Sequence, residues 1–355
     1  MTNRLKNLRN LFDGLKLDAF LVTFLPHLHY LSGFSGSNGI GLVTRRGAFL
    51  VSDSRYTEQI KSEVKGWKVF ISTGSLIEEI SRQKLIKPGM RIGVDGNTIV
   101  LSTYLQLKKT FPGARFLPKV EVVDNICAVK DESEIALLRK AASISDAVFD
   151  ELLGIIKPGM EELEVAAEIS YRHKLHGAVG DSFEPMVVSG ARGALVHGSA
   201  SNKKLKKGEM LTLDFGCVYQ GYNSDMTRTI ALGKPSGEMQ KIYAAVLLAQ
   251  HRAIEAARSG LGGKELDAIA RDIIAKAGYK DYFQHSLGHG IGLQVHELPR
   301  ISIRSKQTLA SGNVVTIEPG IYVPDVGGVR IEDMVLIRDG RCETLTHSPK
   351  HLIVL

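Results

Sequence analysis

Two stretches of the chain share one pattern, and each ends in an acidic residue. Residues 208–216 (GEMLTLDFG) match residues 312–320 (GNVVTIEPG), so that Asp214 corresponds to Glu318. Both stretches are apolar, rich in β-branched residues and bounded by glycine, which is typical of buried strands. A second acid follows each stretch, Asp225 in the first case and Glu332 in the second. Buried carboxylates need strong partners, and four of them brought together by two similar hairpins are most simply explained by metal ions between them.

The similarity extends upstream of the two strands. His197 precedes the first strand and His296 precedes the second, and each half also contains a glycine turn between two helical stretches. This predicts a duplicated helix–helix–hairpin unit with a pseudo-twofold axis on which the acids meet. Chance similarity between two buried strands is the alternative. The shared order of histidine, strand acid and second acid argues against it.

Length and pattern predict two domains. At 355 residues the chain exceeds one typical core, and 44% hydrophobic and 23% charged residues are ordinary for a soluble globular protein. We expect a smaller α/β domain over residues 1–125, a linker over about 118–129, and the duplicated domain over 126–355. The second domain begins with a helix, because Asp131 and Glu134 form a capping pattern.

The beginning of the chain gives a further set of expectations. The spacing of Leu5, Leu8, Phe12 and Leu15 predicts one amphipathic helix. A strand is expected over residues 18–24, and a hairpin over residues 40–51 with its turn at 45–47.

Charge and cysteine content exclude several classes of protein. The net charge is +7 with a pI of about 9.1, but the basic residues are scattered, and the densest run, residues 203–207, is typical of a solvated turn. Nucleic-acid binding is therefore a weak alternative. Three dispersed cysteines indicate a reducing compartment, and the chain shows neither an apolar signal core at its start nor an apolar run long enough for a membrane. We expect a cytoplasmic protein.

Strand periodicity decides which side chains converge, since residues two apart share a face. Asp225 therefore shares a face with Thr227, and Glu318 with Thr316. Arg330 and Glu332 point opposite to Val329 and Ile331. Glu332 is thus preferred to Asp333 as the second acid of this hairpin.

A histidine completes the set of candidate ligands. His289 lies among three glycines, Gly288, Gly290 and Gly292, which indicates close approach of the backbone to something bound. A glycine-rich turn with a surface histidine is the alternative. One imidazole added to four carboxylates suits Mn²⁺, Co²⁺, Fe²⁺ or Zn²⁺.

These segments together resemble one enzyme family. Residues 126–350 resemble the "pita-bread" metallopeptidases, which include methionine aminopeptidase, aminopeptidase P and prolidase. Residues 1–125 resemble the smaller creatinase-like α/β domain of the aminopeptidase P and prolidase branch. The resemblance implies an α/β (α+β) fold with duplicated helix–helix–hairpin halves in the second domain. The segments that carry it are Tyr30–Ser37, Asp53–Tyr56, Leu213–Thr229, His289–Pro299, Thr316–Tyr322 and Gly328–Asp333.

The resemblance also implies a role for each site residue. The metal ligands would be Asp214, Asp225, His289, Glu318 and Glu332. They would hold two divalent ions, Mn²⁺ or Co²⁺ first, with Zn²⁺ or Fe²⁺ also compatible. Glu318 would move the proton of the attacking water, and His296 and His197 would bind the substrate and its tetrahedral intermediate. Arg300 and Arg330 would lie on the substrate side, or would act as salt-bridge partners of the ligands.

The expected reaction is hydrolysis of the amino-terminal bond of peptides with proline in the second position. The first hypothesis is that the protein is an Xaa-Pro aminopeptidase, and the close alternative is an Xaa-Pro dipeptidase (prolidase). Methionine aminopeptidases usually lack the first domain, and creatinase lacks these ligands. A metal-free binding protein on the same fold would have lost ligands that this chain retains.

Two further expectations follow from the same resemblance. Relatives with this first domain are often homodimers in which a neighbouring domain closes the cleft, so a homodimer is expected. His27 stands where relatives often carry asparagine, and its segment is expected to approach a partner's site.

Overall fold

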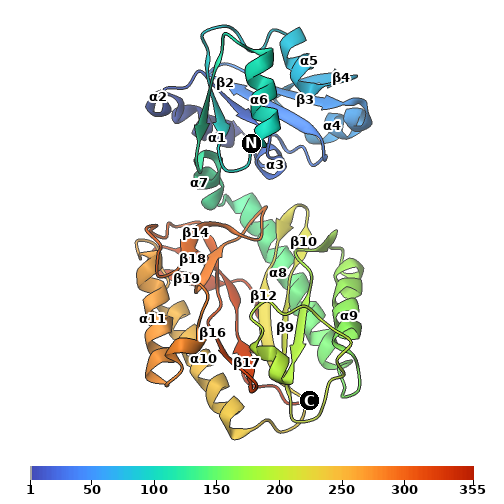
Figure 1. Ribbon diagram of the computed structural model, residues 1–355, viewed down its shortest axis with the longest axis vertical. Coiled ribbons are helices and arrows are strands. Elements are labelled where there is room, and N and C mark those ends of the chain that lie inside the picture. Colours follow the sequence, from blue (N-terminus) through green and yellow to red (C-terminus); the bar gives the residue numbers. More distant parts are fainter. Residues whose placement is uncertain (1) are drawn as a thin grey trace. The chain divides into compact units, whose positions relative to one another are not determined.

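The computed structural model describes residues 2–355, and these form two compact units, one ending at Cys127 and one spanning Ala128–Leu355 (Figure 1). Each unit has its own core. None of the helices within residues 2–355 is long and apolar enough to cross a membrane.

The first unit is a six-stranded mixed sheet with the order β4-β3-β2-β1-β5-β6. The central strand β1 pairs antiparallel with β2 and parallel with β5. The strands are β1 (Ala19–Val22), β2 (Gly39–Thr44), β3 (Ala48–Asp53), β4 (Lys68–Ser72), β5 (Arg91–Asp95) and β6 (Arg115–Lys119). The helices are α1 (Thr2–Asn10), α2 (Phe12–Leu15), α3 (Leu25–Ser32), α4 (Thr57–Glu63), α5 (Leu76–Arg82), α6 (Leu101–Thr110) and α7 (Val122–Ala128).

Local predictions for this unit hold in part. The hairpin of β2 and β3 forms, and β1 lies within the predicted strand. The expected single amphipathic helix is instead two helices, α1 and α2, although Leu5, Leu8 and Phe12 are buried as predicted. The segment predicted as a linker is ordered, because its residues form the end of β6 and helix α7.

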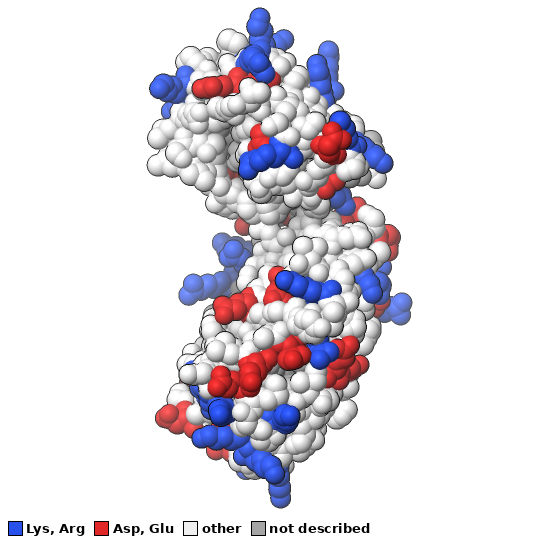
Figure 2. Space-filling model, turned by 90° about the vertical axis from the view of Figure 1, so that its right-hand side faces the viewer, with Lys and Arg blue, Asp and Glu red and all other residues white. Residues whose placement is uncertain are grey.

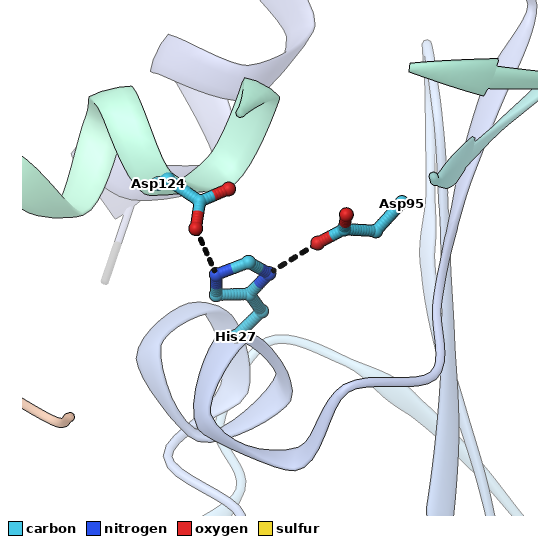
Figure 3. A group of neighbouring side chains, drawn as sticks. All are labelled: His27, Asp95 and Asp124. Carbon is cyan, nitrogen blue, oxygen red and sulfur yellow. Dashed lines mark ion pairs between the residues drawn. The ribbon is translucent and has the colours of Figure 1, made fainter. Parts of the chain in front are cut away.

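The side chain of His27 pairs within its own unit, and the approach of its segment to a partner's site stays a prediction. Its side chain is 2% exposed and lies inside its own unit, between two acids from different elements (Figure 3). Nδ1 is 3.1 Å from Oδ2 of Asp95 at the end of β5, and Nε2 is 3.5 Å from Oδ1 of Asp124 in α7. Burial lowers the pKa of His27, but the two carboxylates outweigh burial and raise the pKa to about 9. His27 is therefore an imidazolium that ties α7 to the sheet.

The second unit consists of two similar halves. Helix α8 begins as predicted, with Asp131 as its N-cap and Glu134 completing a capping box. The first half contains α8 (Glu132–Leu153), α9 (Glu162–Leu175), β7 (Gly180–Asp181), β8 (Met186–Ser189), β9 (Met210–Phe215), β10 (Cys217–Tyr219), β11 (Tyr222–Asn223) and β12 (Met226–Ala231). The second contains α10 (Gly237–Ala256), α11 (Gly263–Lys276), β13 (Gly288–Gly290), β14 (Glu297–Ile301), β15 (Val314–Ile317), β16 (Gly320–Val323), β17 (Gly327–Arg330), β18 (Asp333–Arg338) and β19 (Arg341–Thr344).

Helices cover the outside of this unit and the strands of both halves lie between them (Figure 1). Apolar side chains of α8 and α9 pack against β9 and β12 in one core cluster, and those of α10 and α11 pack against β15 and β18 in another. The pairing of β9 with β12 in the first half corresponds to that of β15 with β18 in the second. This is the predicted duplicated helix–helix–hairpin architecture, and it places the ends of the equivalent strands in the middle of the unit.

Candidate metal centre

The predicted ligands lie at equivalent places in the two halves. Asp225 directly precedes β12, and Glu332 directly precedes β18. Asp214 is the penultimate residue of β9, whereas Glu318 directly follows β15. His289 is the middle residue of β13, which pairs with β15 through Gly290 and Val315. Strand ends from both halves therefore supply the five side chains.

The structure brings these side chains together. Nε2 of His289 is 3.3 Å from Oε1 of Glu318 and 3.7 Å from Oδ2 of Asp225. One potential ligand atom from each of Asp225, His289 and Glu332 lies within 4.8 Å of the other two. Oδ1 of Asp214 is buried without a hydrogen-bond partner among the described residues.

The pKa values of the clustered carboxylates are shifted by burial and by neighbouring charges. Burial raises the pKa of Asp225 well above its usual value, and the neighbouring charge of Asp214 raises it further. Burial likewise raises the pKa of Glu332, with the charges of Asp225 and Glu318 adding to the effect. Burial would also raise the pKa of Glu318, but its hydrogen bond and ion pair with His289 lower that pKa to about 2.

This donor set fits a pair of divalent cations. Four carboxylates and one imidazole converge in a buried place, and one carboxylate oxygen has no partner within the chain. Cations would remove the mutual repulsion that raises the carboxylate pKa values, and mixed oxygen and nitrogen ligands suit transition metals.

Threonine hydroxyl groups donate hydrogen bonds to two of the carboxylates. Thr227 donates a hydrogen bond to Oε2 of Glu332 at 2.7 Å, and Thr316 donates one to Oε1 of Glu318 at 3.1 Å. Such partners orient metal ligands. Asp333, which was set aside as a ligand, instead forms a buried ion pair with Arg228 at 2.7 Å.

Arg330 forms hydrogen bonds with residues in and next to the cluster. Its side chain is buried, and Nη2 donates to Oδ2 of Asp214 at 2.6 Å. Nη1 donates to the hydroxyl of Tyr322 at 2.7 Å, and Nε donates to Oγ1 of Thr227 at 3.1 Å. These contacts make Arg330 a salt-bridge partner of Asp214, which is the second of the two roles considered for it.

The glycines around His289 have a different role from the predicted one. A Cβ atom on Gly288 would lie 2.0 Å from the carbonyl oxygen of Thr316, and one on Gly290 would lie 2.0 Å from that of Leu298. On Gly292 it would lie 2.7 Å from Oε2 of Glu297. The close approach is therefore to neighbouring parts of the same chain, and not to a bound molecule.

The other predicted site residues lie on the exposed side of the cluster. His296 is exposed, and its ring centroid is 4.4 Å from that of His289. The pKa of His296 is lowered by burial and by the charges of His289 and His197. Arg300 is exposed and lies opposite His289 in the β13–β14 ladder. Directly opposed residues point to the same face of a sheet.

Two residues that are linked to the cluster through Arg330 were not predicted from the sequence. The hydroxyl of Tyr322 receives the hydrogen bond of Arg330 and lies 2.9 Å from Nε2 of His285. Tyr322 lies in β16, which belongs to a different sheet from β15, so the alternation that relates Thr316 to Glu318 does not extend to it. His285 precedes β13 in an irregular segment, and no periodic pattern in the sequence identifies it.

Comparison with known proteins agrees with this architecture. A family model described as "Metallopeptidase family M24" matches residues 136–339, and one described as "Creatinase/Prolidase N-terminal domain" matches residues 4–128. The structure of an Xaa-Pro dipeptidase from Bacillus anthracis superposes with a TM-score of 0.96 at 40% identity, covering 100% of this chain and 99% of that one.

Two further relatives cover nearly the whole chain. An Xaa-Pro dipeptidase of Pyrococcus horikoshii is 38% identical over 99% of both chains. The crystal structure of an X-Pro aminopeptidase from Thermotoga maritima gives a TM-score of 0.89 at 38% identity, covering 96% of this chain and 98% of that one. With a family model matching more than half of its length, the chain belongs to metallopeptidase family M24.

Proposed function

We propose that this metallopeptidase is an Xaa-Pro dipeptidase, which cleaves dipeptides with proline in the second position. The observation that carries the proposal is the convergence of Asp225, His289, Glu318 and Glu332 in a chain whose near-full-length relatives bear that name. The sequence favoured an aminopeptidase acting on longer Xaa-Pro peptides. The dipeptidase names among the relatives support the alternative better, and we adopt it.

In this proposal the five ligands hold two divalent ions. The ions would supply a water molecule that ionises near neutral pH, and they would polarise the scissile carbonyl group. Glu318, whose side chain is 16% exposed, would accept the proton of that water. The pairing of Glu318 with Thr316 fixes its carboxylate for this transfer.

His296 and His197 would act on the substrate. Both side chains are exposed next to the cluster, so they can donate hydrogen bonds to the carbonyl oxygen as negative charge develops there. Arg300, on the same face as His289, would bind the carboxylate of the dipeptide. This would also favour substrates that end at proline.

A proline substrate requires a dedicated site. The imide nitrogen carries no hydrogen and the ring fixes φ, so an enzyme that binds an amide N–H at that position excludes it. The leaving nitrogen must still gain a proton, which His296 or the protonated Glu318 would deliver.

The metal, the assembly and the compartment are part of the same proposal. We infer that Mn²⁺ or Co²⁺ occupies the site, that the protein is a homodimer, and that it is cytoplasmic. The ligand chemistry supports the metals. The free state of Cys127, Cys217 and Cys342 supports a reducing compartment.

Product analysis on a peptide panel tests the proposal. The panel pairs Ala-Pro with Ala-Ala, and adds Ala-Pro-Ala and a Met-initiated peptide without proline, each assayed with Mn²⁺, Co²⁺ or Zn²⁺. Hydrolysis of Ala-Pro well above the other three peptides is expected. Equal cleavage of Ala-Ala would refute the proline preference, whereas faster cleavage of Ala-Pro-Ala would return the assignment to an Xaa-Pro aminopeptidase.

A further inference from the structure

The turn that carries His296 is folded around the side chain of the next residue. This turn, residues 291–297, connects β13 with β14. Oε1 of Glu297 accepts a hydrogen bond from the backbone N–H of Gln294 at 3.0 Å, and the N–H of Gly292 donates to the carbonyl of Gln294 at 3.0 Å. Because a Cβ atom on Gly292 would lie 2.7 Å from Oε2 of Glu297, the carboxylate lies directly against the backbone there. Glu297 therefore closes the turn from inside.

A lysine from a distant part of the same unit holds this carboxylate. Nζ of Lys130 lies 2.7 Å from Oε2 of Glu297, and the two side chains are only 1% and 6% exposed. The backbone N–H of Lys130 donates to the carbonyl of Gly312 at 2.9 Å, so the base of the lysine is fixed as well. A buried ion pair is not in itself evidence of stability, since desolvation offsets much of the attraction. The position of the ion pair between Lys130 and Glu297 therefore indicates a role other than stability.

The turn is also attached to the ligand-bearing hairpin. The backbone N–H and the side-chain amide of Asn223 both donate to the carbonyl of Gly292, at 2.8 Å and 2.9 Å. Asn223 lies two residues before Asp225. The turn is thus held on one side by the hairpin of Asp225 and on the other by Lys130, while the ring of His296 rests 4.4 Å from that of His289.

We propose that Lys130 is a positioning residue for the hydrolytic reaction: through Glu297 it fixes the turn that presents His296 to the substrate beside the metal centre. With 1% of its side chain exposed, Lys130 cannot touch the substrate itself. Without its ammonium group, the carboxylate of Glu297 would be buried and unpaired, and it would move towards water and take the turn with it. The inference rests on the proposed role of His296.

The test is a double-mutant cycle between Lys130→Met and His296→Ala, measured on folded protein with its metal content determined. Lys130→Met is expected to retain its metals and to lower kcat roughly 10- to 100-fold, the scale for a misplaced catalytic group. In the His296→Ala background the same substitution is expected to lower kcat no further. A merely structural role would lower kcat by the same factor in both backgrounds, and this result would overturn the proposal.

Two further variants distinguish a loss of positioning from a folding defect. Lys203→Met removes an ammonium group that also lies 2.7 Å from a glutamate, Glu209, but away from the turn, and it is expected to leave kcat unchanged. Lys130→Met combined with Glu297→Gln leaves no unpaired buried charge, and it should fold and still have a low kcat. Full recovery of kcat in this double variant would overturn the positioning role. Metal-loaded His296→Ala with wild-type kcat would instead refute the role proposed for His296, and the inference with it.

Discussion

The hydroxyl group of Thr227 connects two parts of the metal centre. It accepts a hydrogen bond from Nε of Arg330 at 3.1 Å, so its single proton is directed to Oε2 of Glu332 at 2.7 Å. Thr227→Val removes both contacts while keeping the shape of the side chain. We expect metal affinity to fall roughly 10- to 100-fold, measured by competition with a chelator. Thr212→Val is the matched control, because its buried hydroxyl bonds to that of Thr229 and, among residues 2–355, to no carboxylate of the cluster. Equal loss in both variants would contradict this role.

Removal of a ligand should differ from removal of a substrate-binding histidine. Asp225→Ala deletes a buried anion that faces His289, and the purified variant should contain less metal than the wild type by elemental analysis. His296→Ala should retain the wild-type metal content, and its kcat should fall by roughly 10²–10³, the scale for one lost transition-state donor. Loss of metal from the His296 variant would show that the two histidines had been assigned to the wrong roles.

Residue periodicity predicted which acids converge, because a strand sends alternate side chains to opposite faces. It selected Glu332 over Asp333, and the structure places Asp333 on Arg228. Periodicity could not predict which carboxylate Arg330 binds. Arg330 binds Asp214 because β17 packs next to β9. The two residues are 116 positions apart in the sequence, so no local pattern relates them.

At the scale of elements, local signals were reliable where the cause is local. The capping box of Asp131 and Glu134 marks the start of α8 as expected. The glycines around His289 were misinterpreted, because glycine indicates close approach without identifying the approaching group. The segment of α7 was expected to be a linker. Its contact between Asp124 and His27 joins residues far apart in sequence, which no local pattern reveals.

That contact makes the first unit sensitive to alkaline pH. The folded pKa of His27, about 9, lies above its ordinary value of 6.5. Stability from the imidazolium is therefore fully present below about pH 6.5, and it is lost as the pH rises through 9. A pKa difference of this size corresponds to roughly 3 kcal/mol. The charged groups facing His27 are Asp95 from β5 and Asp124 from α7, which both favour its protonated form.

Chemical denaturation of the wild type and of His27→Asn at pH 6 and pH 9.5 tests this expectation. The difference in unfolding free energy between the two proteins should be larger at pH 6 than at pH 9.5. A metal ion is the other possible partner of this cluster. One potential ligand atom from each of His27, Asp95 and Asp124 lies within 4.8 Å of the other two, although the two ring nitrogens face separate carboxylates (Figure 3). An equal difference at both pH values, or stabilisation by added Zn²⁺ that His27→Asn abolishes, would refute the imidazolium.

At the scale of the whole molecule, both signs of charge occur on the face that Figure 2 draws, although the chain carries a net charge of +7. Basic and acidic side chains lie on both units there, and acidic ones form a band across the second unit. The expectation that the basic balance does not mark a nucleic-acid surface stays a prediction. The buried acids of the candidate metal centre also belong to the second unit.

The metal centre joins the two halves of the second unit. Asp214 and Asp225 come from the first half, whereas His289, Glu318 and Glu332 come from the second. Cations bound to both halves would stabilise only the folded state, by about 2.7 kcal/mol at a free concentration one hundred times Kd. Removal of metal by EDTA should therefore lower the unfolding temperature of this unit by roughly 5–10 °C and abolish activity.

Calorimetry of the full chain with and without EDTA checks this prediction. The transition of the first unit should not move, because its stability depends on its own sheet and on the buried pair of His27 with Asp95. Asp225→Ala serves as the control, since a chain that cannot hold the cations has no metal-dependent stability to lose. EDTA should leave the unfolding temperature of this variant nearly unchanged. A wild-type protein that keeps both its activity and its unfolding temperature after exhaustive chelation would show that the two halves are held together without metal.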